Sequence, residues 1–507
     1  MVLNRADHGG RRTLIREALV VDGSGAEPVV GDVTLAGDRI HSIEPAGSAH
    51  ARASDDIWEG SGLALAPGFI DVHTHDDLQV VRAPDIPPKI SQGVTTVIVG
   101  NCGVSGAPFA RAGDLPEPMN LLGPAEAFRY PGFAAYVEAV EAARPAVNVA
   151  ALVGHTALRA NHMERFDREA RPDEIEGMCR QLRDALVQGA LGLSTGLAYA
   201  NARAASTAEV LALAQPLAEA GGVYCTHLRS ESNAIRDALD EAFSIGRQSR
   251  VPVIVSHLKC AGVANHGRSD EVLALLDSAA REQSLGCDCY PYTASSSLLD
   301  LMQVTDEFDI LITWSRPHPE MGGRLLAAIA SEWGRDLLET ARRLQPAGAV
   351  YHCMAEADVE RILRHPLAAI GSDGLPNDPL PHPRLWGAFP RVLGHYVRER
   401  RLFSLAEAVR KMTGLSAERF GLRGRGFVRP GYAADLVLFD PASIGDTATF
   451  AQPVQSATGI AGVWVNGVLT WRERENIGGR AGRFLRRGSL APAGDGNRTG
   501  AQVAIAG

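Results

Sequence analysis

The segment PGFIDVHTHDD (residues 67–77) combines an apolar, strand-like run with two histidines at its end. The run begins at Phe69, and His73 and His75 follow it with a single residue between them. Side chains on a strand alternate between its two faces, so these two imidazoles are expected to point the same way. Two imidazoles on one face at a strand end are well suited to binding a metal ion.

Seven more apolar runs follow along the chain, and helical segments separate them. The eight runs are Phe69–His75, Thr95–Gly100, Asn148–His155, Ala190–Gly196, Gly222–Leu228, Val251–Leu258, Leu285–Tyr292 and Ala368–Gly374. The intervening segments Asp173–Gln188 and Thr207–Ala220 carry leucine and alanine at helical spacing. This alternation predicts the α/β class with a parallel sheet, and eight strands predict a (β/α)8 barrel of the TIM type.

The regions on either side of the predicted barrel are rich in short strands. Strand-like patterns occur in residues 13–43 and again at Ala434–Phe439 and Val463–Val465, where Asn466–Gly467 predicts a turn. We expect both ends of the chain to build one small β-sandwich. The predicted units are 1–65 and 423–487 for this β domain, 66–422 for the barrel, 295–350 for an inserted mobile lid, and 488–507 for a disordered tail.

Composition limits the class of protein and its partners. Of the 507 residues, 45% are hydrophobic and 21% are charged, as in ordinary soluble globular proteins. The net charge of −9 argues against a nucleic-acid partner, which would require clustered lysine and arginine. Met1–Arg12 lacks the apolar core of a signal peptide, and no apolar run is long enough to span a membrane. Seven scattered cysteines favour reduced thiols in the cytoplasm.

Residues that bind metals stand at the ends of five of the eight predicted strands. After the two histidines of the first strand come Cys102, His227, His257 and Asp373, which end the second, fifth, sixth and eighth strands. Active sites of such barrels lie at the carboxyl ends of the strands. A single histidine there would more often be structural, but the whole set predicts a metal site. For His155, which ends the third strand, the pattern leaves both roles open.

This order of ligands resembles the amidohydrolase superfamily, and several segments resemble its N-acyl-D-amino-acid deacylases, the D-aminoacylases. Besides the first segment, they are GVTTVIVGNCGVS (93–105), GLSTGLAY (192–199), THLRSE (226–231), SHLK (256–259), DCYPYTA (288–294), GSDG (371–374) and RGRGFVRPGYAADLVLFDP (423–441). The resemblance extends over nearly the whole chain, from about Thr13 to Arg487. It is more specific to this group than to the substrate of any one member.

The resemblance implies one tightly bound zinc ion, Zn²⁺, held by Cys102, His227 and His257. The two histidines of the first strand would form a weaker second metal position. Many binuclear amidohydrolases place a carbamylated lysine at the end of the fourth strand, but Ala190–Gly196 contains no lysine. Cys102 can take a related position, because a thiolate is a good soft ligand for zinc. The other six cysteines are interpreted as structural.

The predicted reaction is hydrolysis of the amide bond of N-acyl-D-amino acids to a carboxylate and a free D-amino acid. A zinc ion activates water and polarises an amide carbonyl. Asp373 would accept the proton of the attacking water and donate it to the leaving amine. Arg384 could bind the substrate α-carboxylate in a bidentate manner. The resemblance places Lys259, Tyr290 and Ser296 around the same carboxylate, and Tyr199 near the substrate.

The wall after the seventh strand is apolar and predicts a preference for hydrophobic substrate side chains. It contains Leu298, Leu299, Leu301 and Met302, and no cation lies between Ser295 and Asp306. Two other interpretations are a cyclic amidase of the dihydropyrimidinase or hydantoinase kind and a metal-free scaffold protein. The missing fourth-strand lysine disfavours the first, and the retained ligands disfavour the second. The sequence does not fix the oligomeric state.

Overall fold

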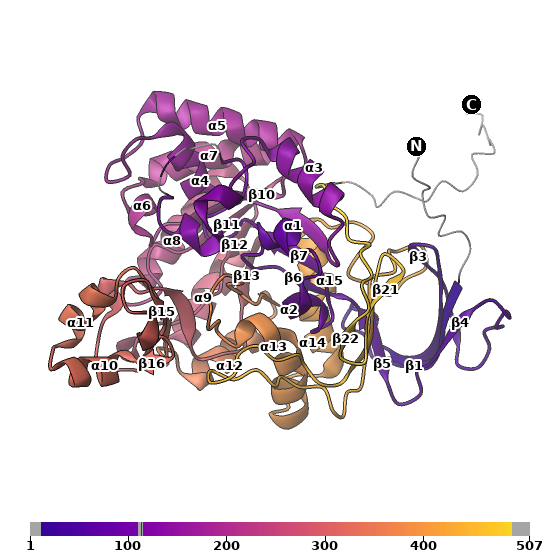
Figure 1. Cartoon of the computed structure of the whole chain (residues 1–507). Helices are drawn as coiled ribbons and strands as arrows, with labels where there is room; N and C mark the ends of the chain where they lie inside the picture. Colours follow the sequence, from indigo (N-terminus) through magenta and orange to yellow (C-terminus); the bar gives the residue numbers. More distant parts are fainter. Residues whose placement is uncertain (1–11, 110–112, 114, 489–507) are drawn as a thin grey trace, which may run out of the picture.

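The computed structural model describes residues 12–109, 113 and 115–488 (Figure 1). The predicted tail therefore lies outside the described residues, apart from Gly488. So does nearly all of the N-terminal segment Met1–Arg12. Among the helices that are described, none is both long enough and apolar enough to cross a bilayer.

Every one of the eight predicted runs contains strand, and all of these strands pair in parallel. They are β6 (Phe69–Asp71), β7 (Val94–Val99), β8 (Asn148–Ala151) with β9 (Val153–Gly154), β10 (Gly192–Gly196), β11 (Val223–His227), β12 (Val253–Val255), β13 (Leu285–Cys289) and β18 (Ala368–Ile370). One sheet has the order β6-β7-β8 and the other β9-β10-β11-β12-β13-β18. A parallel bridge between Thr74 and Gly374 connects the last strand back to the first. The predicted α/β class is confirmed.

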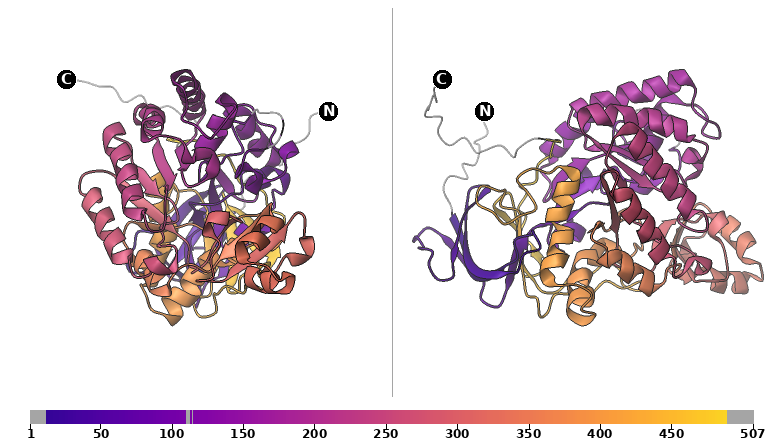
Figure 2. Two further views of the ribbon diagram at one scale, coloured as in Figure 1. Left: turned by 90° about the vertical axis from the view of Figure 1, so that its left-hand side faces the viewer. Right: turned by 180° about the vertical axis from the view of Figure 1, so that it is seen from behind.

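Helices surround these strands on their outer side (Figures 1 and 2). The longer ones are α3 (Phe133–Ala143), α5 (Pro172–Val187), α7 (Thr207–Ala220), α8 (Ile235–Ser249), α9 (Ser269–Ala280), α12 (Glu356–Arg364) and α14 (Leu405–Met412). The two predicted helices are confirmed as α5 and α7. In α8 the buried Ile235, Leu239 and Ala242 recur at helical spacing, so one face packs against the strands. The Ser206 hydroxyl accepts from the backbone N–H of Glu209 and begins α7.

Strands from both ends of the chain share one nine-stranded sheet beside the parallel strands (Figure 1). The N-terminal part contributes β1 (Arg12–Val20), β2 (Val29–Ala36), β3 (Arg39–Pro45), β4 (Asp56–Glu59) and β5 (Ala64–Pro67). The C-terminal part contributes β19 (Leu436–Phe439), β20 (Ile460–Val465), β21 (Val468–Arg472) and β22 (Glu475–Asn476). The two parts join where β5 pairs antiparallel with β19. The turn predicted at Asn466–Gly467 connects β20 to β21, with positive φ at both residues.

The segment after β13 has secondary structure of its own. It forms a four-stranded antiparallel sheet, and its strands are β14 (Ser295–Leu298), β15 (Ile310–Ser315), β16 (Arg324–Leu325) and β17 (Ala347–Tyr351). Helices α10 (Leu326–Trp333) and α11 (Leu337–Leu344) accompany it. Thr313 donates a hydrogen bond to Asp378, which fixes the sheet to the loop that follows β18. The segment therefore lies next to the carboxyl ends of the parallel strands.

Candidate metal centre and active site

The predicted ligands, which are up to 300 residues apart in the chain, meet around the thiol of Cys102. Its Sγ atom lies 3.1 Å from His73 Nε2 and 3.2 Å from His257 Nε2. Asp373 joins them, since its Oδ1 lies 3.5 Å from His73 Nε2. One ligand atom from each of these four residues lies within 4.8 Å of the other three, and all four residues are buried. This cluster is compact enough to hold a metal ion.

The two remaining predicted ligands border the same cluster. His75 Nε2 lies 3.2 Å from Asp373 Oδ1. The ring of His227 is centred 4.5 Å from the ring of His257. The Nδ1 atoms of His75 and His227 are both buried, and neither has a hydrogen-bond partner in the described structure. Buried ring nitrogens without a partner are rare, and no protein hydrogen bond holds either ring through Nδ1 in the described structure.

Three residues of the cluster have left-handed backbone conformations. Cys102 has a φ of 53°, His257 of 34° and Asp373 of 50°. Such conformations cost about 1–3 kcal/mol each and persist only where surrounding structure fixes them. The loop of Cys102 is fixed by Asn101, whose side-chain amide donates to the carbonyl of Ile98. The turn after each strand thereby directs its functional side chain toward the common centre.

The charges in the cluster are those that a divalent cation requires. Burial alone would raise the pKa of the Cys102 thiol, but His73 and His257 hold it well below its usual value. Burial likewise opposes ionisation of Asp373, yet the Arg384 guanidinium and His257 keep the pKa of its carboxyl well below its usual range. The negative charges of the thiolate and the carboxylate can be balanced either by protons on the imidazoles or by a bound metal ion. A thiolate, imidazoles and a carboxylate are ligands that fit zinc.

Two carboxylates outside the cluster orient its histidines, and sequence reasoning missed both. Asp288 Oδ2 lies 3.3 Å from His73 Nδ1, and Glu231 Oε1 lies 2.8 Å from His257 Nδ1. A carboxylate in this position fixes the ring orientation and makes the other nitrogen a better ligand. Both residues lie in segments that already carried the family resemblance, THLRSE and DCYPYTA. Their position in these segments is the sequence feature from which they could have been predicted.

A buried lysine ties the first strand to the eighth. Lys89 of α2 (Pro87–Ile90) donates to Asp71 Oδ2 at 2.8 Å and to Ser372 Oγ at 2.8 Å. Its Nζ also lies 3.3 Å from Asp76 Oδ2. Asp71 precedes His73 by two residues, and Ser372 precedes Asp373. The lysine therefore fixes the distance between the strand that leads to His73 and the loop that carries Asp373.

Replacing this lysine is expected to destabilise the whole protein. Lys89→Met leaves Asp71 buried without its counter-charge, and breaking a buried pair in this way costs about 3–5 kcal/mol. Urea unfolding monitored by circular dichroism measures the change in the free energy of unfolding. Arg165→Met is the matched control, because it breaks the exposed Arg165–Asp167 pair and should change nothing measurable. Equal stability of the two variants would contradict the role of Lys89.

Beside the cluster lies a set of polar groups without partners. Arg384 is buried. Its Nη2 forms an ion pair with Asp373 Oδ2 at 2.9 Å and donates to the Ser296 carbonyl at 3.2 Å. Its guanidinium lies 4.5 Å from the centre of the Tyr290 ring.

Four buried polar atoms beside the cluster have no hydrogen-bond partner in the described structure: Arg384 Nε and Nη1, Tyr290 Oη and Ser296 Oγ. Leaving such groups unpaired is costly, so the arrangement favours an anionic ligand.

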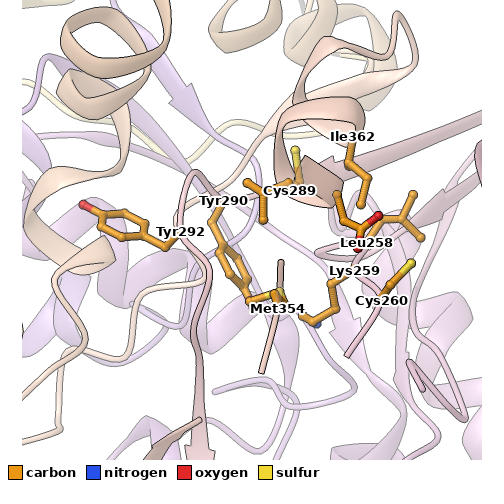
Figure 3. A pocket seen from close by; sticks show the side chains of 10 residues that line it. Leu258, Lys259, Cys260, Cys289, Tyr290, Tyr292, Met354 and Ile362 are labelled. Atoms are coloured by element: carbon orange, nitrogen blue, oxygen red, sulfur yellow. The ribbon is translucent and has the colours of Figure 1, made fainter. Parts of the chain in front are cut away.

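The other two predicted substrate residues lie on either side of this set. The Nζ of Lys259 lies 5.8 Å from the centre of the Tyr290 ring, and both side chains line the pocket in Figure 3. The ring of Tyr199 is centred 4.9 Å from the ring of His227. The structure thus places all eleven predicted site residues in one region. His155 instead packs away in the core, where its Nε2 lies 2.9 Å from Glu209 Oε1.

Comparison with known proteins adds to this geometry. The model of the amidohydrolase family matches residues 60–470. Three relatives from Alcaligenes xylosoxydans xylosoxydans each align with 94% of this chain. They are D-aminoacylase, N-acyl-D-aspartate deacylase and N-acyl-D-glutamate deacylase, with 48%, 47% and 45% identity over 97%, 96% and 96% of their own lengths. The chain belongs to the N-acyl-D-amino-acid deacylase family of the amidohydrolases.

Solved structures agree with membership of the deacylase family. N-acyl-D-glutamate deacylase from Bordetella bronchiseptica, complexed with zinc and a phosphonate inhibitor, has a TM-score of 0.90 and 45% identity. The match covers 94% of this chain and 99% of that one. Dihydropyrimidinase from Brevibacillus agri has a TM-score of 0.60 at 15% identity over 95% and 100% of the two chains. The cyclic amidase therefore shares the fold alone.

The segment after β13 differs in one respect from the purely apolar wall that the sequence predicted. Leu299 is buried, but Met302 is 75% exposed. Arg203, from α6 (Ala200–Arg203), donates to the Met302 sulfur at 3.0 Å. The segment after β13 contains no cation of its own here, but the fold brings one from the segment after β10. Since the three relatives differ by only a few per cent in identity, identity does not decide the side-chain preference.

Proposed function

We propose that this protein is a zinc-dependent hydrolase of N-acyl-D-amino acids, releasing a carboxylate and a free D-amino acid with a hydrophobic side chain. One observation carries the proposal. Buried donors of Arg384, Tyr290 and Ser296 lack partners in the described structure and lie directly beside the Cys102 cluster. A free α-carboxylate next to a hydrolysable amide satisfies both features. The proposed partner is this small molecule, with no nucleic acid or membrane.

The proposed zinc ligands are Cys102, His227 and His257, with His73 and His75 as a weaker second position. The ring of His227, centred 4.5 Å from that of His257, and the lowered pKa of the Cys102 thiol support this choice. A bound zinc ion would activate water and polarise the acyl carbonyl. The zinc complex of the Bordetella relative is consistent with the same metal here.

The protein's own side chains then divide the remaining work. Asp373 accepts the proton of the attacking water and donates it to the nitrogen of the leaving amine, because amines leave poorly without a proton. Arg384 holds Asp373 and, with Tyr290, Ser296 and Lys259, binds the α-carboxylate. This carboxylate fixes the amide at a constant distance from Asp373. Tyr199 borders the same space beside His227.

The architecture that fits these contacts is a closed (β/α)8 barrel. The bridge from Thr74 to Gly374 supports closure between the first and last strands. We propose the units 66–422 for the barrel with its insertion at 295–350, and 1–65 with 423–487 for a small β-sandwich. The insertion would act as a lid over the site. A cytoplasmic location is proposed from the cysteine content and the net charge alone.

Paired enantiomers test the proposed function directly. The zinc-loaded protein is expected to hydrolyse N-acetyl-D-leucine and to leave N-acetyl-L-leucine, hydantoin and dihydrouracil unchanged. Release of free leucine and ring opening are measured separately. Cleavage of the L-enantiomer alone would overturn the assignment of stereochemistry, and ring opening alone would favour a cyclic amidase. N-acetyl-D-glutamate in the same panel tests the proposed preference for a hydrophobic side chain.

The tyrosine hydroxyl offers a mild test of carboxylate binding. Tyr290→Phe removes a buried hydroxyl that has no partner in the described structure, so the free energy of unfolding should stay equal or rise. Loss of one hydrogen bond to a charged group should raise the KM for N-acetyl-D-leucine about tenfold or more. Steady-state kinetics and urea unfolding measure the two effects. Tyr130→Phe is the control, because its ring packs against Tyr136 and no contact to the Cys102 cluster is found for it among the described residues. An unchanged KM would remove Tyr290 from the carboxylate site.

A further inference from the structure

One carboxylate oxygen serves both the proposed metal site and the proposed carboxylate site. Glu231 Oε1 lies 2.8 Å from His257 Nδ1 and 2.5 Å from Lys259 Nζ. Lys259 Nζ also lies 2.8 Å from His257 Nδ1. The lysine and the histidine are buried, and the glutamate side chain is only 16% exposed. The three groups therefore compete for contacts in a nearly dry environment.

The ring of His257 can serve a metal in only one of its two neutral forms. Its Nε2 faces the Cys102 sulfur at 3.2 Å, so this nitrogen must offer its lone pair to the metal. Nδ1 then carries the hydrogen and donates it to Glu231. An ammonium group has donors but no acceptor. The Glu231 oxygen can accept from both neighbours, but Lys259 Nζ, 2.8 Å from His257 Nδ1, opposes a hydrogen on that nitrogen. It either takes the Glu231 oxygen or donates to Nδ1, which would move the ring hydrogen to Nε2.

We propose that Glu231 couples substrate binding to metal retention through Lys259 and His257. This inference rests on the proposed function, because it takes Lys259 as a ligand of the substrate α-carboxylate. When that carboxylate draws Lys259 away, Glu231 Oε1 is left to His257 alone. The metal-binding form of the ring is then favoured, and the metal is held more tightly. By linkage, a bound metal strengthens carboxylate binding by the same factor.

The surroundings of Lys259 give it room to change partners. Its side chain lines a pocket with Tyr290, Met354 and Ile362, so part of its surface borders open space rather than other side chains (Figure 3). Glu231, in contrast, retains a histidine contact whichever way the lysine moves, since its second oxygen lies 3.7 Å from His227 Nε2. In this proposal Lys259 is the member that changes partners, and Glu231 stays with the histidines. We class Glu231 as a positioning residue.

The rate of zinc loss tests this coupling without relying on turnover. The zinc-loaded full chain is mixed with excess chromophoric chelator, alone or with saturating D-leucine or D-leucinamide. The two ligands differ only in the carboxylate. Direct binding of zinc by D-leucine acts equally on the wild type and on Glu231→Gln, so a ligand difference that requires Glu231 is not due to it. D-leucine is expected to slow zinc loss about fivefold or more relative to D-leucinamide. Equal rates with the two ligands would overturn the proposal.

Two variants are expected to move the rate in opposite directions. Glu231→Gln should speed zinc loss about 10–100-fold, as for other outer carboxylates, and abolish the difference between the two ligands. Lys259→Met should slow zinc loss without any ligand, because Glu231 then serves His257 alone. Structural damage would not slow it. Faster loss from Lys259→Met, or a retained ligand difference in Glu231→Gln, would overturn the coupling.

A second glutamate provides the matched control. Glu241 is partly buried and accepts from Arg229 at 2.8 Å and 2.9 Å, and no contact to the Cys102 cluster is found for it among the described residues. Glu241→Gln should lose zinc at the wild-type rate. Turnover of N-acetyl-D-leucine by the wild type distinguishes failure of the coupling from failure of the proposed function. If turnover occurs and the ligands act equally, the coupling fails while the proposed function stands. If no turnover occurs, the proposed function itself fails.

Discussion

Asp373→Asn should lower kcat for N-acetyl-D-leucine about a thousandfold or more while zinc remains bound. The carboxamide keeps the shape of the side chain and can still accept from Arg384, but it cannot take up a proton. General acid–base catalysis of this kind contributes about 10²–10⁴-fold, and here one group serves both proton transfers. Asp373→Ala should be equally inactive. The loss should appear in kcat, because the groups proposed to bind the carboxylate remain.

Two measurements separate lost chemistry from lost structure in this variant. Metal analysis of the purified protein should show the wild-type zinc content, since Cys102, His227 and His257 are unchanged. Asp167→Asn removes an exposed carboxylate far from the cluster and should leave kcat unaltered. A kcat for Asp373→Asn within tenfold of the wild type would refute its role as the proton carrier.

Cys102→Ser should weaken zinc binding more than about 100-fold. Loss of a residue that only hydrogen-bonds to a ligand weakens metal binding about 10–100-fold, and loss of a ligand should cost more. The serine hydroxyl does not ionise near neutral pH, whereas the pKa of the Cys102 thiol is held well below its usual value by His73 and His257, against the effect of burial. Zinc therefore loses its soft anionic ligand. Competition with a chelator measures the affinity, and turnover at low zinc should fall in parallel.

A buried cysteine outside the cluster is the control for this variant. Cys179 of α5 donates weakly to the carbonyl of Ala212, and a serine can make the same contact. Cys179→Ser should bind zinc as tightly as the wild type. An unchanged zinc affinity in Cys102→Ser would remove Cys102 from the proposed ligands, and the cluster would then depend on its histidines and Asp373.

Much of the fold could be predicted because strands and helices leave local patterns. Helix α5 was predicted to within one residue at each end, and α7 to the residue, since helical spacing of leucine and alanine repeats within a few residues. The residues of the cluster could be predicted for a related reason. His73, His257 and Asp373 lie two or three positions after the strands β6, β12 and β18, and parallel strands bring their carboxyl ends to one edge.

The partners of those ligands could not be predicted in the same way. Glu231 and Asp288 contact His257 and His73 across gaps of 26 and 215 residues, and no periodic pattern links such pairs. Lys89 lies in a short helix of four residues and pairs with Asp71 and Ser372 only because the first and last strands meet. Arg203 reaches Met302 in the same manner, from a segment about 100 residues earlier that no local pattern connects with it.

By itself, the sequence determined which residue types end the parallel strands, and therefore that imidazoles, a thiolate and a carboxylate are available for a metal ion. The tertiary structure decided how they are coupled. It placed Glu231 Oε1 between His257 and Lys259, and it left Arg384, Tyr290 and Ser296 with unpaired polar atoms. The physical reason is that strand and helix patterns depend on neighbours along the chain, whereas hydrogen bonding and charge pairing depend on distances of a few ångströms between segments far apart in sequence.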